Sequence, residues 1–161
     1  MTIGVSSDHR GYKLKEKLMK YLTSRGFVVV DYGTNSQESV DYPDYAFILC
    51  DAINNRDVDM GLAVCGSGIG ISIACNKVKG IRCAKADSIR DAKKARLDND
   101  ANCLALSGRM HAFKAKDIVD TFFTTDFSKE ERHIRRIDKI KEYEKEHMKT
   151  VKSKKVMEDE R

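Results

Sequence analysis

The stretch Cys65–Gly70, CGSGIG, decides how this chain folds, because it joins two different patterns of hydrophobic residues. Before it stands the apolar run Gly61–Val64, which predicts a buried parallel strand. After it comes the apolar sequence ISIA at 71–74, which predicts a helix. A strand that ends in a glycine-rich turn at a helix N-terminus directs several backbone N–H groups to one point. The stretch therefore predicts a binding site for a phosphate or an oxyanion.

A thiol, Cys65, occupies the last strand position before this turn. Backbone N–H groups at a helix N-terminus favour a thiolate over a thiol. A thiolate base beside an anion-stabilising loop is what abstraction of a proton next to a carbonyl requires. The alternative role of Cys65, that of a small buried hydrophobic residue, fits the glycine-rich surroundings less well. A dinucleotide site is also disfavoured, because the glycines miss the G-x-G-x-x-G spacing by one residue.

Short apolar runs alternate with amphipathic stretches along the whole chain. Strands are expected at 2–6, 27–32, 60–64, 81–85 and 103–107. Helices are expected at 11–24, 68–77, 88–97, 113–123 and from about 128 to beyond 143, and another is expected to end at Asn54 after the loop that contains Pro43. This order predicts the α/β class: a three-layer α/β/α sandwich with a five-stranded parallel Rossmann-like sheet and an extended C-terminal helix. We expect one domain over 1–144 and a charged helix end or tail over 145–161.

Parallel α/β sheets bind ligands beyond the carboxyl ends of their strands. The residues expected there are Asp8, His9, Arg10, Cys65–Gly70, Asp87, Gly108 and Arg109. Asn99, Asp100 and Asn102 instead lie on the loop that enters the fifth strand, at its opposite end. If these three serve such a site, they reach it from a neighbouring subunit.

A cationic cluster stands in the last predicted helix. Arg132 and Arg136 are one turn apart and flank His133. Two arginines so placed suit a phosphate dianion, although such a pair is more often a solvated helix face.

Composition excludes several classes of protein. The five cysteines include no C-x-x-C pair, which argues against a disulfide framework and a thiolate zinc site. The net charge of +5 owes much to KTVKSKKV at 149–156, so we expect no nucleic-acid partner. No apolar run approaches the roughly 20 residues that span a bilayer. The N-terminal sequence lacks the pattern of a secretory signal, so we expect no membrane association and a cytoplasmic protein.

The chain resembles the ribose-5-phosphate isomerase B family, which includes the subunits of galactose-6-phosphate isomerase. The resemblance covers nearly everything up to about Tyr143. It rests on six motifs: DHRG from Asp8, DYP from Asp41, CGSGIGISIACNK from Cys65, NDAN from Asn99, SGR from Ser107 and RHIRR from Arg132. The family implies a five-stranded parallel sheet, no metal or other cofactor, and a homodimer with shared active sites, or a tetramer.

The resemblance also implies a reaction, the interconversion of a phosphorylated aldose and ketose, with ribose 5-phosphate and ribulose 5-phosphate as the first expectation. Cys65 would move the proton between C1 and C2 through a cis-enediolate. Ser67 replaces the family's common threonine and would carry a proton between the substrate oxygens. The backbone N–H groups that would hold the enediolate belong to Gly66, Gly68, Ile69 and Gly70.

The remaining family roles concern the two ends of the sugar. Asp8 would bind hydroxyls and assist ring opening, and Asn99 would bind the hydroxyl end. The phosphate would be held by His9, Arg109, Arg132 and Arg136, with His133 close by.

One position departs from the family pattern. Many members carry a histidine before the Asn-Asp pair, credited with opening the furanose ring, where this chain has Asp98. An aspartate has an ordinary pKa of about 3.9 against about 6.5 for histidine, so it is a weaker proton shuttle near neutral pH. Three alternatives follow: Asp98 opens the ring, Asp8 does so alone, or the substrate is not mainly cyclic. The candidates are then a tetrose 4-phosphate, allose 6-phosphate or galactose 6-phosphate, or a weakly catalytic sugar-phosphate-binding subunit that needs a partner chain.

Overall fold

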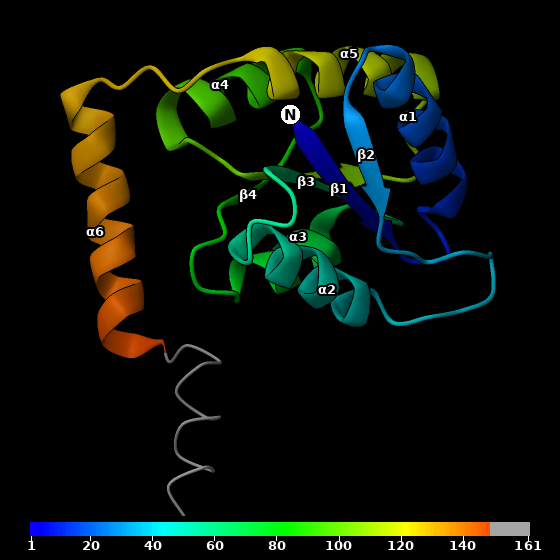
Figure 1. Ribbon diagram of the computed structural model, residues 1–161, viewed down its shortest axis with the longest axis horizontal. Coiled ribbons are helices and arrows are strands. Elements are labelled where there is room, and N and C mark those ends of the chain that lie inside the picture. Colours follow the sequence, from blue (N-terminus) through cyan, green and yellow to red (C-terminus); the bar gives the residue numbers. More distant parts are fainter. Residues whose placement is uncertain (149–161) are drawn as a thin grey trace, which may run out of the picture. The chain divides into compact units, whose positions relative to one another are not determined.

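A computed structural model describes residues 1–148 of the chain (Figure 1). They form two units, 1–128 and the part that begins at 129. The strands are β1 (Thr2–Ser7), β2 (Val28–Asp31), β3 (Met60–Cys65), β4 (Cys83–Lys85) and β5 (Cys103–Ser107). The helices of the first unit are α1 (Tyr12–Ser24), α2 (Tyr42–Asn54), α3 (Ile69–Asn76), α4 (Ile89–Asn99) and α5 (Ala112–Thr124). The second unit contributes α6 (Glu131–His147).

The five strands form one parallel sheet in the order β2-β1-β3-β5-β4. Figure 1 shows α1, α4 and α5 on one face of this sheet and α2 and α3 on the other. The predicted three-layer α/β/α architecture is therefore confirmed. The strand order reverses between β1 and β3, and ligands of such sheets bind in the crevice at that reversal.

The two faces of the sheet have side chains of different size. Leu62 and Val64 of β3 pack with the larger hydrophobic residues under α1, α4 and α5, whereas Ala63 and Cys65 face α2 and α3. Small residues on the second face let its helices approach closely. A Cβ atom at Gly61 would lie 2.8 Å from Ile53 Cδ1 of α2. The alternating pattern of β3 thus sets the spacing of both outer layers.

Element boundaries differ from the expected ones for identifiable reasons. The third helix begins at Ile69 rather than at Gly68, because Gly68 has the left-handed backbone of a cap (φ 77°). Strand β4 is shorter than expected, because the N–H of Arg82 bonds to the side chain of Asn102 instead of a neighbouring strand. Helix α6 begins at Glu131, after Lys129 adopts a positive φ of 58°.

The expected domain boundary after residue 144 and the expected charged tail both remain predictions. The boundary expected after residue 144 is followed by three more residues of α6. The rest of the proposed tail, and the basic stretch 149–156, lies outside the described residues. No helix within the described range 1–148 is long and apolar enough to cross a membrane.

Candidate active site

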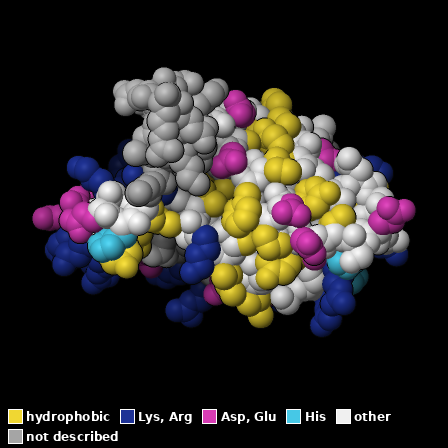
Figure 2. All heavy atoms as spheres, turned by 90° about the horizontal axis from the view of Figure 1, so that it is seen from below, with side chains coloured by type: hydrophobic (Ala, Val, Ile, Leu, Met, Phe, Trp, Pro, Cys, Tyr) yellow, Lys and Arg dark blue, Asp and Glu magenta, His cyan; other side chains and the backbone are white. Residues whose placement is uncertain are grey.

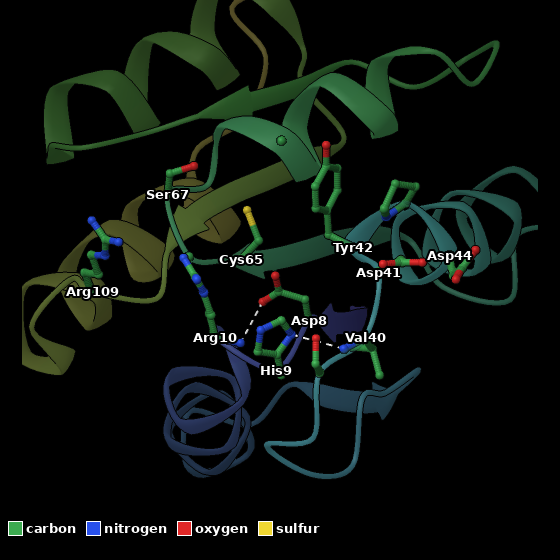
Figure 3. A pocket seen from close by; sticks show the side chains of 14 residues that line it. Asp8, His9, Arg10, Val40, Asp41, Tyr42, Asp44, Cys65, Ser67 and Arg109 are labelled. Carbon is green, nitrogen blue, oxygen red and sulfur yellow. Dashed lines mark hydrogen bonds between the residues drawn. The ribbon is translucent and has the colours of Figure 1, made fainter.

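A cavity of about 720 Å³ opens at the carboxyl ends of β1 and β3, where the strand order reverses. Figure 3 shows its side chains converging from several segments. Asp8, His9 and Arg10 follow β1, Cys65 ends β3, and Arg109 follows β5. Ser39–Asp44, Gly66, Ser67 and Gly70 complete the lining. Of the residues expected beyond strand ends, Asp8, Cys65 and Arg109 thus lie together, whereas Asp87 is not part of this lining and pairs with Lys85 at 2.7 Å.

The Cys65 thiol lies at the N-terminus of α3. Its Sγ accepts a hydrogen bond of 3.2 Å from the backbone N–H of Gly68, and the residue is only 3 % exposed. Only glycine fits at position 68: φ is 77°, and a Cβ atom would lie 2.8 Å from the carbonyl carbon of Leu106. Ser67 is exposed, and its Oγ accepts a hydrogen bond from the N–H of Ile69 at 3.1 Å. The turn therefore holds the sulfur against backbone donors.

Asp8 is fixed by the turn that follows β1. Its Oδ1 accepts hydrogen bonds from the N–H groups of Arg10 at 2.9 Å and Gly11 at 3.0 Å. The residue is 5 % exposed, and its second carboxylate oxygen points toward Cys65 in Figure 3. Two backbone donors on one oxygen hold this buried carboxyl group in a fixed orientation.

The ring of His9 is oriented by the loop before α2. His9 Nδ1 accepts a hydrogen bond of 3.2 Å from the N–H of Val40. That bond requires an unprotonated Nδ1, so the neutral ring carries its proton on Nε2. In Figure 3 His9 lies between this loop and Asp8.

The β3 and β5 ends are joined by hydrogen bonds that keep the cavity floor in place. The N–H of Gly108 donates to the carbonyl of Cys65 at 2.7 Å, and Ser107 Oγ donates to the carbonyl of Gly66 at 2.8 Å. Close packing requires glycine here too, since a Cβ atom at Gly108 would lie 2.4 Å from the carbonyl oxygen of Arg10. Arg109 leaves this floor with an exposed side chain that can reach an anion.

Several predicted site residues are not brought to this cavity within the first unit. Asp98 and Asn99 end α4 at the amino end of the sheet, where Asp98 Oδ2 lies 3.9 Å from Lys94 Nζ. Asn102 has a structural role there, since its amide donates to the carbonyl of Gly80 at 2.9 Å. Their expected participation from a neighbouring subunit stays a prediction.

The cationic cluster of α6 belongs to the second unit. Arg132 and Arg136 lie one turn apart in this helix, as expected. Glu130 forms an ion pair with Arg132, and its Oε2 lies 3.6 Å from His133 Nε2. A phosphate bound by Arg132 would have to compete with this carboxylate.

Sequence reasoning named Arg10 only as a strand-end residue and gave Tyr42 no role. Both line the cavity, and a Cβ atom at Gly66 would lie 2.9 Å from Arg10 Cδ. Signals for both were present, because Arg10 follows Asp8-His9 directly and Tyr42 is the centre of the DYP motif.

Sequence reasoning also missed an arrangement of the other thiols. Cys50, Cys75 and Cys103 are buried, and Cys83 is half-buried. The Sγ atoms of Cys75, Cys83 and Cys103 all lie within 4.8 Å of one another. The pKa of Cys75 is lowered, chiefly because a hydrogen bond from the thiol of Cys103 stabilises its thiolate. Nothing in the spacing of these cysteines indicates that they meet.

Comparison with known proteins identifies the class to which this fold and site belong. The sequence model of the family described as Ribose/Galactose Isomerase matches residues 3–140. The chain is 40% identical over 153 residues to ribose-5-phosphate isomerase B of Mycobacterium tuberculosis, covering 91% of this chain and 92% of the relative. The chain therefore belongs to the ribose/galactose isomerase family. It is a sugar phosphate isomerase of the ribose-5-phosphate isomerase B type, an aldose–ketose isomerase.

Solved structures agree with this assignment. Ribose-5-phosphate isomerase B of Clostridium thermocellum superposes with a TM-score of 0.89 at 45% identity, covering 91% of this chain and 99% of that one. The enzyme of Mycoplasma genitalium, solved with bound ribulose 5-phosphate, gives a TM-score of 0.85 at 42% identity, covering 90% and 97%.

Proposed function

We propose that this chain interconverts ribose 5-phosphate and ribulose 5-phosphate with Cys65 as the catalytic base. The observation that carries the proposal is the position of the Cys65 sulfur, buried at the strand reversal and 3.2 Å from the N–H of Gly68. The sulfur stands at the N-terminus of α3 and lines the cavity, where it can take a proton from a bound substrate. The ribulose 5-phosphate bound to the Mycoplasma genitalium relative supports the choice of substrate.

The proton transfer would proceed as follows. The Cys65 thiolate takes the proton from C2 of the open-chain aldose, and the C–H electron pair forms the C1–C2 double bond of a cis-enediolate. Negative charge then develops on the former carbonyl oxygen, where N–H groups of the turn after Cys65 can stabilise it. The exposed hydroxyl of Ser67 is available to move a proton between the two oxygens. Return of the proton from Cys65 to C1 yields the ketose.

Charged groups around the cavity would fix the two ends of the sugar. Asp8 has one carboxylate oxygen bound to backbone N–H groups and the other directed toward Cys65, which suits sugar hydroxyls. His9 can donate from Nε2, and Arg10 and Arg109 bring two further cations to the cavity. A phosphate bound there would orient C1 and C2 at the sulfur.

We further propose that the enzyme is a homodimer that packs through the outer face of α2 and α3. Figure 2 shows apolar side chains gathered on this side of the molecule. They include the exposed residues Phe47 and Ile48 of α2 and Ile69 and Ile73 of α3. The same helices supply the cavity residues Tyr42 and Gly70, so a partner on this face would stand at the cavity rim. We propose that this partner contributes Asn99 and the arginines of α6, as expected of a neighbouring subunit.

Replacement of the base tests the proposal directly. Cys65→Ala should lower the turnover of ribose 5-phosphate by at least about a hundredfold, the smaller end of what a general base contributes. Substrate binding, measured by calorimetry, should remain. Cys50→Ala is the matched control, because it removes a buried thiol outside the cavity and should keep turnover within a few-fold. Turnover of Cys65→Ala near that of the unchanged chain would exclude Cys65 as the base.

A second substrate class deserves testing because of Asp98. This residue stands where many family members carry a ring-opening histidine. A sugar phosphate that is already in the open-chain form does not need that step. A tetrose 4-phosphate cannot close a furanose ring through its phosphorylated oxygen. Assays of ribose 5-phosphate, allose 6-phosphate, galactose 6-phosphate and both tetrose 4-phosphates with the purified chain decide between these substrates. No turnover of any of them would favour a binding subunit that needs a partner chain.

A further inference from the structure

A cluster of three thiols lies at the opposite end of the sheet from Cys65. Cys83 and Cys103 are the first residues of β4 and β5 and stand in register on these neighbouring strands. Register partners in a parallel pair present their side chains on the same face of the sheet. Cys75, from the last turn of α3, meets them on that face, and all three Sγ atoms lie within 4.8 Å of one another.

These separations are close to what a metal ion needs. Metal–sulfur bonds of about 2.3 Å in a trigonal arrangement place the sulfur atoms about 4 Å apart. Closure of the cluster thus needs sulfur shifts below about one ångström, which side-chain rotation can supply. Soft thiolate ligands select soft cations such as Cu(I) and Zn(II).

The backbone around the cluster is held rigidly. The side chain of Asn76 binds Cys83 twice, since Asn76 Oδ1 accepts from its N–H at 2.8 Å and Asn76 Nδ2 donates to its carbonyl at 2.9 Å. Asn102 Oδ1 accepts from the N–H of Arg82 at 2.8 Å, next to Cys83. Two asparagines therefore fix the backbone at Cys83 before any ligand arrives, as supporting residues do at metal sites.

Burial and access also fit a bound cation. Cys75 and Cys103 are fully buried, whereas Cys83 is half-buried and is the most exposed residue of the cluster. A fourth buried cysteine, Cys50, is engaged otherwise, because its thiol lies 3.9 Å from the carbonyl oxygen of Cys75 and donates to it. The cluster therefore offers three sulfur ligands, and Cys50 is a neighbouring thiol that is not one of them.

We propose that Cys75, Cys83 and Cys103 form a binding site for one soft d10 cation, Cu(I) or Zn(II), held by three sulfur atoms. Each thiol that ligates as a thiolate releases its proton to solvent when its metal–sulfur bond forms, and no electron is transferred. The site is separate from the cavity at Cys65, so it does not depend on the catalytic proposal.

Metal titration of the reduced protein under anaerobic conditions tests the site. The parent is Cys65→Ala, which removes the cavity thiol as a competing ligand. Cu(I), supplied as its bicinchoninate complex, and Zn(II), in competition with a chromophoric chelator, are added in separate arms. We expect one equivalent of at least one ion, with X-ray absorption giving three sulfur neighbours. Failure of both ions to bind the folded parent, or a shell of fewer than three sulfurs, would overturn the proposal.

Two variants in this parent separate the site from adventitious binding. Cys83→Ala changes the half-buried ligand, with the least disturbance to packing, and should weaken binding by more than about a hundredfold. Cys50→Ala removes a neighbouring thiol that is not a ligand and should keep one equivalent of metal. Circular dichroism checks that both variants are folded. Undiminished binding by folded Cys83→Ala, or its loss in folded Cys50→Ala, would contradict the assignment of the three sulfurs.

Discussion

Gly68 is the position where structure and chemistry depend most closely on one another. It is the N-cap of α3, has a φ of 77°, and donates its N–H to the Cys65 sulfur at 3.2 Å. In Gly68→Ala the new Cβ atom would lie 2.8 Å from the carbonyl carbon of Leu106 and 3.0 Å from the N of Ser107. Both contacts are with backbone, which cannot rotate away.

The magnitude follows from two costs. A side chain in the left-handed region costs about 1–2 kcal/mol, and overpacking against a rigid neighbour costs about 1–3 kcal/mol more. We therefore expect Gly68→Ala to lower the free energy of unfolding by about 2–5 kcal/mol. Relief of the clash also moves the N–H away from the Cys65 sulfur. Loss of one hydrogen bond to a charged group costs about 1.5–3 kcal/mol, which corresponds to a fall in kcat of about ten- to a hundredfold.

Gly26→Ala is the matched control for the backbone term. Gly26 has a φ of 92°, and a Cβ atom there would meet no heavy atom within 4 Å. It should lose only about 1–2 kcal/mol and keep its activity. Urea unfolding at one fixed protein concentration and an isomerase assay measure both quantities. Equal stability losses in the two variants, with kcat unchanged in Gly68→Ala, would refute the reasoning.

Three further predictions concern the phosphate, the ring and the dimer. Arg136→Ala should raise KM about tenfold to a hundredfold, because a charge-assisted hydrogen bond to the phosphate is lost. If the sites are shared, mixing Arg136→Ala with Cys65→Ala should restore activity. No recovery after proven subunit exchange would contradict a shared site. Asp98→His should raise turnover of ribose 5-phosphate and narrow its difference from a tetrose 4-phosphate. A slower Asp98→His enzyme would make Asp98 itself a competent part of the site. Ile73→Glu should produce a monomer in analytical ultracentrifugation, because it buries a charge in the proposed interface. Phe113→Glu, at an exposed residue of α5, is the control and should leave the dimer intact. A dimeric Ile73→Glu would place the interface elsewhere.

The class of the fold and the strand-end residues of the site follow from the order of elements in the sequence. Strands and helices alternate, and each has its own hydrophobic period, so a parallel sheet covered on both faces was predictable. Carboxyl ends of parallel strands share one edge, which placed Asp8, Cys65 and Arg109 together without knowledge of the strand order. These relations are local in the chain, or follow from the direction common to all the strands.

Tertiary structure decided what depends on contacts between distant segments. The order β2-β1-β3-β5-β4 places the reversal between β1 and β3 and brings the loop at Val40 onto His9. The same order sets β4 beside β5, so that Cys83 and Cys103 stand in register and Cys75 of α3 closes a three-thiol cluster. No spacing in the sequence encodes that meeting, because side chains in register on neighbouring strands can lie any distance apart along the chain.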